Sequence, residues 1–483
     1  MPARSDAAAP DPLDPITMTS DSPGTDSVAK DSVAVPSLPP GPRLPVAAQT
    51  ARAWRATIPF FDAATRRYGP IFTIRVLPWG TAVVVNDADL VKEVFSGDPA
   101  VYHAGEGNGI LAPIVGARSV LVLDEDEHLC ARRTLLPPFH GEAVRAYGRV
   151  VEEIVTAEVR RWPLLDPFPL HPRFRAITLE VILRAVIGVS DPSRMSALRE
   201  LLPECLQISP TIMAMWALPM LGHVGRWRRF RAKLAEANRL LRDEIRERRR
   251  DPRLEQRDDV LSRLIVGGES DDEELRDQIM TLLVAGHETS STGLAWTFER
   301  LLRHPTTLAR AREGDDAYLD AVVQETLRVR PVLPVVLRQL RAQVSLGGYE
   351  LPAGITVMPA ITLMHENPAL FSEPLRFKPE RFLDGDEGGT YEWIPFGGGR
   401  RRCLGAAFAS LEMRVVLRTI LHAVELRADV PADEAVRNHH ITLVPARGAR
   451  VVRSGWQALP PWPGRRRLTA HARQRPSADM TTA

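Results

Sequence analysis

The stretch that decides the fold is FGGGRRRCLG, Phe396–Gly405, in which three glycines and three arginines precede one cysteine. Glycines such as Gly397–Gly399 permit backbone turns that other residues avoid. A helix-forming run, AAFASLEMRVVLRTILHAV, follows, so Cys403 is expected beside a helix N-terminus, where free N–H groups and the dipole favour negative charge. With Arg401 and Arg402 adjacent, we predict a lowered thiol pKa and a thiolate that can bind metal.

Other readings of these ten residues stay open at this point. A glycine run can cradle phosphate, but the Lys-Ser/Thr pair of a P-loop is missing. A reactive thiol, an iron ligand and a structural loop all remain. The other two cysteines, Cys130 and Cys205, form no Cys-x-x-Cys pair, and we expect both to be small buried side chains in a reducing compartment.

The composition is that of a globular protein. Among 483 residues, 44% are hydrophobic and 25% charged, and the net charge of +2 gives no field that would attract nucleic acid. The longest nearly apolar run, Ile212–Gly225, is short of the roughly 20 residues that a membrane span needs. The N-terminus lacks the basic start and apolar stretch of a signal peptide. We therefore expect a cytoplasmic protein without a transmembrane anchor.

The chain is predicted to have one folded domain between loose ends. Residues 1–45 are rich in Pro, Ser, Ala and Asp and should be disordered. Residues 46–455 should form the domain, and the Pro- and Arg-rich residues 456–483 a loose tail.

Helical patterns dominate the domain. Two β-branched runs, Ile71–Val76 and Thr81–Asn86, flank a turn and predict a hairpin, and a second strand region is expected over Val344–Pro359. Many helices with few strands predict a mainly α fold with small sheets. The clearest helical segments are Glu142–Trp162, Gly225–Arg250 and Ser270–Arg303.

The cysteine loop resembles the haem-binding loop of the cytochrome P450 family, Phe-x-x-Gly-x-Arg-x-Cys-x-Gly. Three further segments are similar to family motifs: AGHETS (Ala285–Ser290) to the oxygen-activation motif, ETLR (Glu325–Arg328) to Glu-x-x-Arg, and FKPERF (Phe377–Phe382) to the segment supplying a second arginine. The similarity covers roughly residues 38 to 453. It implies a cytochrome P450-like fold, with a large helical domain around a long central helix and small antiparallel β-sheets, and a haem-thiolate catalytic domain over residues 46–455.

The resemblance implies a haem b cofactor with Cys403 as its axial iron ligand. The thiolate would push electron density onto iron. Four cationic side chains would bind the haem propionates, two of them four residues apart on one helix face. The expected cofactor-binding residues are His128, Arg132, Arg338, Phe396, Arg401, Cys403 and Gly405.

Two residues of the central helix would carry protons to oxygen. Glu288 and Thr289 resemble the family's acid–alcohol pair, and Gly286 and the Thr289 hydroxyl should weaken the helix locally and make room for O2. His287 is expected to be structural. The family's buried ion network would comprise Glu325, Arg328 and Arg381, supporting the ligand loop without catalysing.

Apolar segments would line the substrate pocket, so we expect a lipophilic substrate such as a fatty acid, steroid or terpenoid. The apolar run Ile212–Leu221 would lie at its entrance. The residues expected in the pocket are Ile110, Leu111, Ala285, Val335, Val336 and Thr442.

The resemblance favours a monomeric monooxygenase that inserts one oxygen atom from O2 into this substrate. No flavin or nicotinamide domain is visible, so electrons should come from NAD(P)H through a ferredoxin reductase and a ferredoxin, which could dock on Arg133, Arg400 and Arg402. One alternative is a peroxide-using, isomerase or dehydratase haem-thiolate enzyme, which often lacks the acid–alcohol pair. Another is a non-catalytic haem-binding or ligand-sensing protein, for which no output domain is visible.

Overall fold

The computed structural model describes residues 38–206, 225–268, 270–385 and 388–456. Most of the predicted N-terminal segment, the predicted tail beyond residue 456 and the apolar run Ile212–Leu221 lie outside the described residues. In the described part of the chain, no helix is long and apolar enough to cross a membrane.

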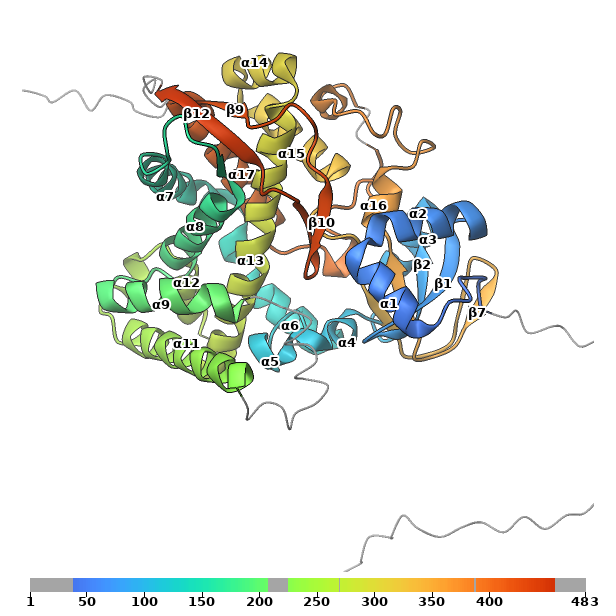
Figure 1. The fold of residues 1–483 in the computed structure, drawn as a ribbon. Coiled ribbons are helices and arrows are strands. Elements are labelled where there is room, and N and C mark those ends of the chain that lie inside the picture. The colour runs from blue at the N-terminus through green and yellow to red at the C-terminus, as the bar shows by residue number, and fades with distance from the viewer. Residues whose placement is uncertain (1–37, 207–224, 269, 386–387, 457–483) are drawn as a thin grey trace, which may run out of the picture. The chain divides into compact units, whose positions relative to one another are not determined.

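A 30-residue helix, α13 (Asp272–Leu301), organises the helical part of the fold (Figure 1). It begins at Asp271, whose carboxylate accepts a hydrogen bond from the Glu274 amide at 2.8 Å, and its first turn is acidic, as the helix dipole favours. From Ser290 to Leu301 it is buried around the whole circumference, as in a helix surrounded by neighbours. It packs against α8 (His171–Val181), α11 (Gly225–Arg249), α15 (Asp316–Val329) and α17 (Ala406–Ala423).

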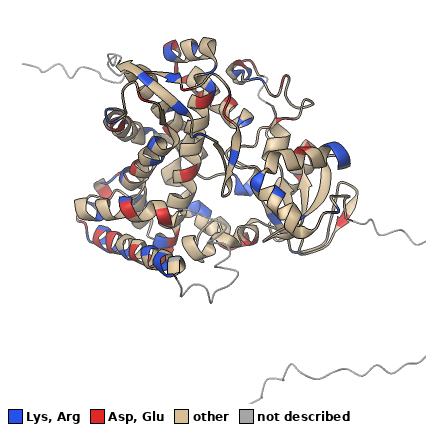
Figure 2. Cartoon of the chain, in the orientation of Figure 1, with Lys and Arg blue, Asp and Glu red and all other residues tan. Residues whose placement is uncertain are grey.

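The predicted mainly α fold is confirmed. The expected helices are present as α7 (Gly141–Val159), α11 and α13, although α7 ends three residues before the predicted Trp162. Figure 2 shows both basic and acidic residues along α11, where pairs one turn apart such as Arg239–Asp243 add to the stability of the helix. The other helices are α1 (Val46–Arg55), α2 (Thr57–Tyr68), α3 (Ala88–Ser96), α4 (Ala104–Gly107), α5 (Ala112–Val115), α6 (Glu125–Leu135), α9 (Pro192–Cys205), α12 (Val260–Gly267), α14 (Pro305–Glu313) and α16 (Ile361–His365).

The strands form small sheets. The predicted hairpin is confirmed as β1 (Ile71–Val76) antiparallel to β2 (Gly80–Val85). The second predicted strand region contains β6 (Val344–Leu346), β7 (Tyr349–Leu351) and β8 (Thr356–Pro359), and β8 joins β2 in parallel. The first sheet has the order β1-β2-β8-β5-β3, with β5 at Arg338–Leu340 and β3 at Tyr102–His103.

Two further strand groups lie near the end of the chain. β10 (Val436–His439) and β11 (Thr442–Pro445) form a hairpin, and β11 packs against α13. The other sheet joins β4 (Phe168–Pro169), β12 (Arg450–Trp456) and β9 (Val424–Ala428). The hairpin therefore brings residues near position 440 to the middle of the central helix.

Candidate active site

The cysteine loop is held in one shape by its backbone. The Cys403 N–H donates to the Phe396 carbonyl at 2.9 Å, and the Gly405 N–H donates to the Cys403 sulfur. Gly399 has a φ of +63°, and a Cβ there would lie 2.0 Å from the Phe95 carbonyl oxygen, so only glycine fits. The loop thus presents the sulfur just before α17 begins at Ala406.

The prediction of a lowered Cys403 pKa is wrong for the protein alone. Burial raises the pKa of this thiol, and the Gly405 amide, Arg132 and Arg402 oppose the rise without cancelling it. Arg401, the other arginine named in that prediction, forms an ion pair with Asp124. Yet the Cys403 side chain is accessible. The thiol is therefore surrounded by protein but still open to contact, and a cation placed against it would favour the thiolate.

Four basic side chains gather beside this thiol. His128 is buried, and its pKa falls to about 3 through burial and then through Arg401, Arg132 and Arg338. Burial also lowers the pKa of Arg338 to about 10, with Arg401 adding to the effect. The structure therefore brings together the four basic residues that the sequence analysis assigned to the haem propionates.

These cations lack enough negative charge among the described residues. Arg401 is paired with Asp124 and also donates to the Leu123 carbonyl at 2.5 Å. Within the described ranges, neither Arg132 nor Arg338 has a carboxylate at ion-pair distance, and Arg338 instead lies 5.4 Å from the centre of the Phe95 ring. Buried guanidinium groups without anions are costly, so the donor set fits a ligand that carries carboxylates.

Helix α6 explains why His128 and Arg132 act together. They lie four residues apart, one turn of the helix, and their side chains point inward. Cys130 is two residues from each, so it falls on the opposite face and is exposed. The prediction that Cys130 is buried is wrong for this reason, whereas Cys205 is fully buried as predicted.

The middle of α13 forms another side of the candidate site, in addition to the cysteine loop and the basic residues beside it. Ala285 is exposed although its neighbours Leu283 and Val284 are buried. The Thr289 hydroxyl donates to the Ala285 carbonyl at 2.6 Å. A Cβ at Gly286 would lie 3.2 Å from Ile182, so this glycine permits close helix packing. α13 is assigned as one uninterrupted helix through this segment.

Glu288 has partners that the sequence analysis missed. Its carboxylate lies 3.1 Å from His439 Nδ1, 3.3 Å from Arg175 Nε and 3.9 Å from His171 Nε2. Burial alone would raise the pKa of Glu288, but the hydrogen bond with His439 and the charge of Arg175 lower it to about 2. No sequence pattern links α8, α13 and β10, so only the fold could identify the cluster. His287, expected to be structural, is buried with Nδ1 3.1 Å from the Thr178 hydroxyl.

The segments predicted to line the pocket also converge. α5 and β11 both pack against α13, and α4 packs against β5. The Leu443 backbone N–H donates to the Val332 carbonyl at 2.8 Å, and this bond joins β11 to the segment that contains Val335 and Val336. Ile110, Val335 and Val336 are half-buried, whereas Leu111 and Thr442 are buried. The Thr442 hydroxyl donates to the His439 carbonyl at 2.8 Å.

The predicted support network is present as a buried ion cluster. Glu325 lies 2.7 Å from Arg328 and 3.2 Å from Arg381, and all three side chains are fully buried. Arg328 also donates to the carbonyls of His365 and Pro374, at 2.8 and 2.7 Å. The cluster thus joins α15 to the segment that leads to the cysteine loop.

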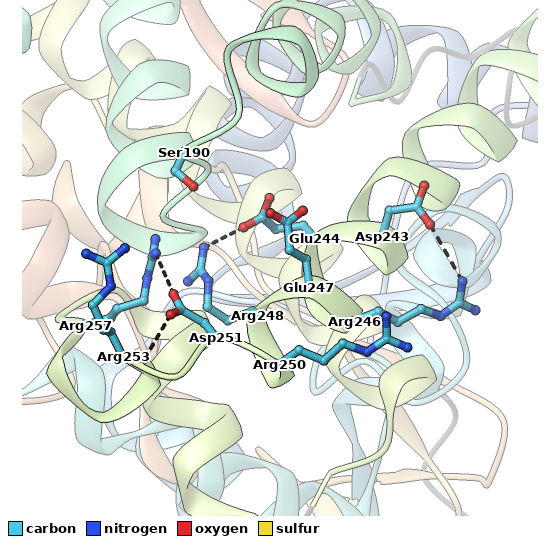
Figure 3. A pocket seen from close by; sticks show the side chains of 10 residues that line it. All are labelled: Ser190, Asp243, Glu244, Arg246, Glu247, Arg248, Arg250, Asp251, Arg253 and Arg257. Carbon is cyan, nitrogen blue, oxygen red and sulfur yellow. Dashed lines mark hydrogen bonds and ion pairs between the residues drawn. The ribbon is translucent and has the colours of Figure 1, made fainter.

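A hollow of about 630 Å³ near the end of α11 contains none of these residues (Figure 3). It is lined by Ser190, Asp243, Glu244, Arg246, Glu247, Arg248, Arg250, Asp251, Arg253 and Arg257. Most of its charges are already paired, as the dashed contacts of Arg248 with Glu244 and of Arg257 with Asp251 illustrate. Because most of the charged groups of this hollow already satisfy one another, we take the Cys403 region, and not this hollow, as the candidate active site.

Comparisons with known proteins agree with this fold. The family profile for cytochrome P450 matches residues 36–449. A relative designated cytochrome P450 135B1, from Mycobacterium tuberculosis and Mycobacterium bovis, is 46% identical over 429 residues, covering 86% of this chain and 91% of its own length. Cytochrome P450 137 of M. tuberculosis is 39% identical over 397 residues, covering 80% and 83%.

Solved structures share the fold at lower identity. A cyanobacterial structure described as retinoic acid-bound CYP120A1 has a TM-score of 0.75 and 23% identity, covering 87% of this chain and 99% of its own. The haem domain of cytochrome P450DA has a TM-score of 0.72 and 23% identity, covering 87% and 97%.

The fold and the cysteine site define a haem-thiolate monooxygenase. The chain belongs to the cytochrome P450 family. Its cofactor is haem b. The donor set described above fits this group, because haem b offers two carboxylates to the basic cluster and an iron to the accessible sulfur.

Proposed function

We propose that this enzyme inserts one oxygen atom from O2 into a lipophilic small molecule, with Cys403 Sγ holding the haem iron. One observation carries the proposal: an accessible thiol adjoins two guanidinium groups, Arg132 and Arg338, that have no carboxylate at ion-pair distance among the described residues. Haem b, when bound, supplies the iron at which O2 is activated.

The protein's own groups would position the cofactor and protect the sulfur. Arg132, Arg338 and His128 would bind the propionates, and Arg401 would hold Asp124 beside them. The Gly405 N–H would withdraw charge from the thiolate and so tune its electron donation. Glu325, Arg328 and Arg381 would keep the loop in place.

Thr289 and Glu288, on α13, would transfer protons to the site where O2 is activated. The Thr289 hydroxyl donates to Ala285 now and can exchange this bond for one to a water or to oxygen. Because the pKa of Glu288 is about 2, Glu288 would act as a proton-accepting relay and not as a stored acid. The Glu288–Thr289 pair favours monooxygenation over peroxide-driven or isomerase chemistry.

Apolar side chains around Ala285 support a fatty acid, steroid or terpenoid as substrate, because the segments named for the pocket offer no charged anchor. Electrons would come from NAD(P)H through a ferredoxin reductase and a ferredoxin. Exposed Arg133, Arg400 and Arg402 support an acidic partner.

A compound library tests the substrate class. Compounds that displace iron-bound water change the absorption spectrum, and we expect apolar molecules to do so and small charged ones to fail. Binding of charged compounds alone would reject a lipophilic substrate.

Thr289→Ala tests proton handling. We expect more electrons to end in hydrogen peroxide and fewer in product, measured with NADPH, a plant-type ferredoxin and its reductase. Thr297→Ala is the matched control, because the Thr297 hydroxyl makes the same bond to a carbonyl four residues earlier, Gly293, at 2.9 Å. Equal coupling in both variants would reject the role of Thr289.

A further inference from the structure

The β10–β11 hairpin places an imidazole on the Glu288 carboxylate. His439 is the last residue of β10, and its Nδ1 lies 3.1 Å from Glu288 Oε1. The His439 side chain is 26% exposed, compared with 18% for Glu288. His439 therefore touches the carboxylate and is the more accessible of the two groups.

The position of His439 is fixed by its surroundings. Its carbonyl accepts from the Thr442 hydroxyl at 2.8 Å across the turn. On the next strand, the Leu443 carbonyl accepts from Trp296 Nε1 of α13 at 2.7 Å. The neighbouring Asn438 amide donates to Thr57 in α2. The hairpin is therefore anchored to two helices, and the contact between His439 and Glu288 is built into the fold.

The other charged or titratable groups around Glu288 are less suited to move a proton. Arg175, at 3.3 Å, does not release its proton near neutral pH. His171 is 3.9 Å away, its Nε2 already contacts the Thr292 hydroxyl at 3.2 Å, and mainly burial lowers its pKa to about 4.

The remaining titratable or charged neighbours of Glu288 are also poorly suited to pass it a proton. Burial lowers the pKa of both His287 and His440 to about 4, so both rings are neutral at neutral pH. Arg437, the other nearby charge on β10, is an arginine like Arg175. His439 is left as the group that makes a hydrogen bond with the carboxylate and can exchange protons with water.

We propose that His439 passes protons from solvent to Glu288. The ring takes a proton from water at Nε2 and releases one from Nδ1 to Glu288 Oε1, so the imidazole gains and loses one proton. Glu288 then gives that proton to the Thr289 side of the site and returns to the carboxylate. The inference rests on the proposed role of the Glu288–Thr289 pair and adds a positioning and relay residue outside the family motif.

Two substitutions separate a relay from a structural tether. In His439→Asn the side-chain amide can keep a hydrogen bond to Glu288 but cannot carry a proton, whereas His439→Ala removes both functions. A relay predicts that both variants slow oxygen consumption about 100-fold, the low end for positioned proton transfer, and raise the solvent isotope effect. A tether predicts that the asparagine variant behaves like the native enzyme, which would overturn the proposal.

The assay does not require the natural substrate. Oxygen consumption driven by NADPH through a plant-type ferredoxin and its reductase needs protons at the site whether or not product forms. His440→Asn is the matched control, because the two rings are adjacent, with centroids 4.1 Å apart, but Glu288 bonds to His439. We expect this control to keep the native rate and isotope effect.

Glu288→Gln distinguishes this inference from the proposed function. If Glu288→Gln leaves oxygen consumption unchanged, the role of Glu288 itself is wrong, and the relay through His439 is wrong with it. If Glu288→Gln slows oxygen consumption while His439→Asn does not, the relay alone is rejected. Slowing in both variants, with the carbonyl spectrum intact, supports the relay.

Discussion

At Cys403, single residues of the loop and of α6 determine what the sulfur can do. Gly399 permits the loop to pass the Phe95 carbonyl, and the Gly405 N–H reaches the sulfur. Burial raises the pKa of the thiol, so the free protein favours the neutral form. A metal cation bound to the sulfur would supply the missing stabilisation, so thiolate formation and cofactor binding would be one coupled event.

The residue-scale prediction concerns Glu325. Glu325→Ala removes the carboxylate that the buried guanidinium groups of Arg328 and Arg381 both contact. We expect a loss of about 3–5 kcal/mol in the free energy of unfolding, together with loss of haem incorporation. Denaturant unfolding and the haem-to-protein ratio measure the two effects.

Glu373→Ala is the control, because Glu373 pairs with Arg376 at 3.1 Å but both side chains are mostly exposed. It should change neither quantity noticeably. A Glu325→Ala protein with normal haem content would contradict the role given to the network.

At the scale of elements, α13 and α17 meet through a buried carboxyl. Glu412 on α17 hydrogen-bonds to Ser290 on α13, and its Oε1 has no partner among the described residues. Burial raises its pKa to about 8, so the folded protein keeps this group neutral at pH 7.

This raised pKa gives a pH prediction with a definite sign. An unfolded glutamate has a pKa of about 4.3, so the contribution of Glu412 to stability is complete below pH 4.3 and is lost as the pH rises to about 8. Glu412→Gln resembles the neutral form, so its stability relative to the native protein should rise over this interval. Denaturant unfolding at a series of pH values from 5 to about 8.5 measures the difference. Parallel pH curves for the two proteins would contradict the assignment.

The sequence predicted the long helices and the first hairpin well, because the hydrophobic periodicity and the turn residues that define each of them lie within its own segment. The central helix, the β1–β2 hairpin and α11 follow from periodicity and turn residues in their own segments. Cys130 was misplaced because burial depends on which face of α6 the fold covers. The Glu288–His439 contact joins residues 151 positions apart and has no local signal.

At the scale of the whole molecule, the proposed site is assembled from segments spread along nearly the whole described chain. α6, α13, β5 and the cysteine loop each contribute side chains. The resemblance to family motifs predicted most of these residues. That Arg132 and Arg338 have no carboxylate at ion-pair distance among the described residues could be seen only from the folded arrangement. The Cys403 pKa was predicted with the wrong sign because burial, a property of the whole fold, outweighs the local charges.

The whole-molecule prediction concerns electron delivery. Arg133 and Arg400 are exposed on two elements, α6 and the cysteine loop. Arg133→Glu combined with Arg400→Glu should slow reduction by an acidic ferredoxin at least about tenfold at low salt. The native rate should fall with ionic strength, since the Debye length is about 10 Å at 0.1 M.

Stopped-flow reduction at several salt concentrations measures this effect. Arg55→Glu, at the exposed end of α1, is the control and should keep the native rate. Equal rates in the double variant and the native enzyme would contradict docking on this face.

The most direct test of the account is the spectrum of the reduced, carbon monoxide-treated protein. Thiolate ligation predicts the red-shifted Soret band of the native protein, and Cys403→Ser should lose this band while Cys130→Ser, an exposed-cysteine control, keeps it. A native protein without the shifted band, or a Cys403→Ser protein that retains it, would contradict the claim that Cys403 holds the iron.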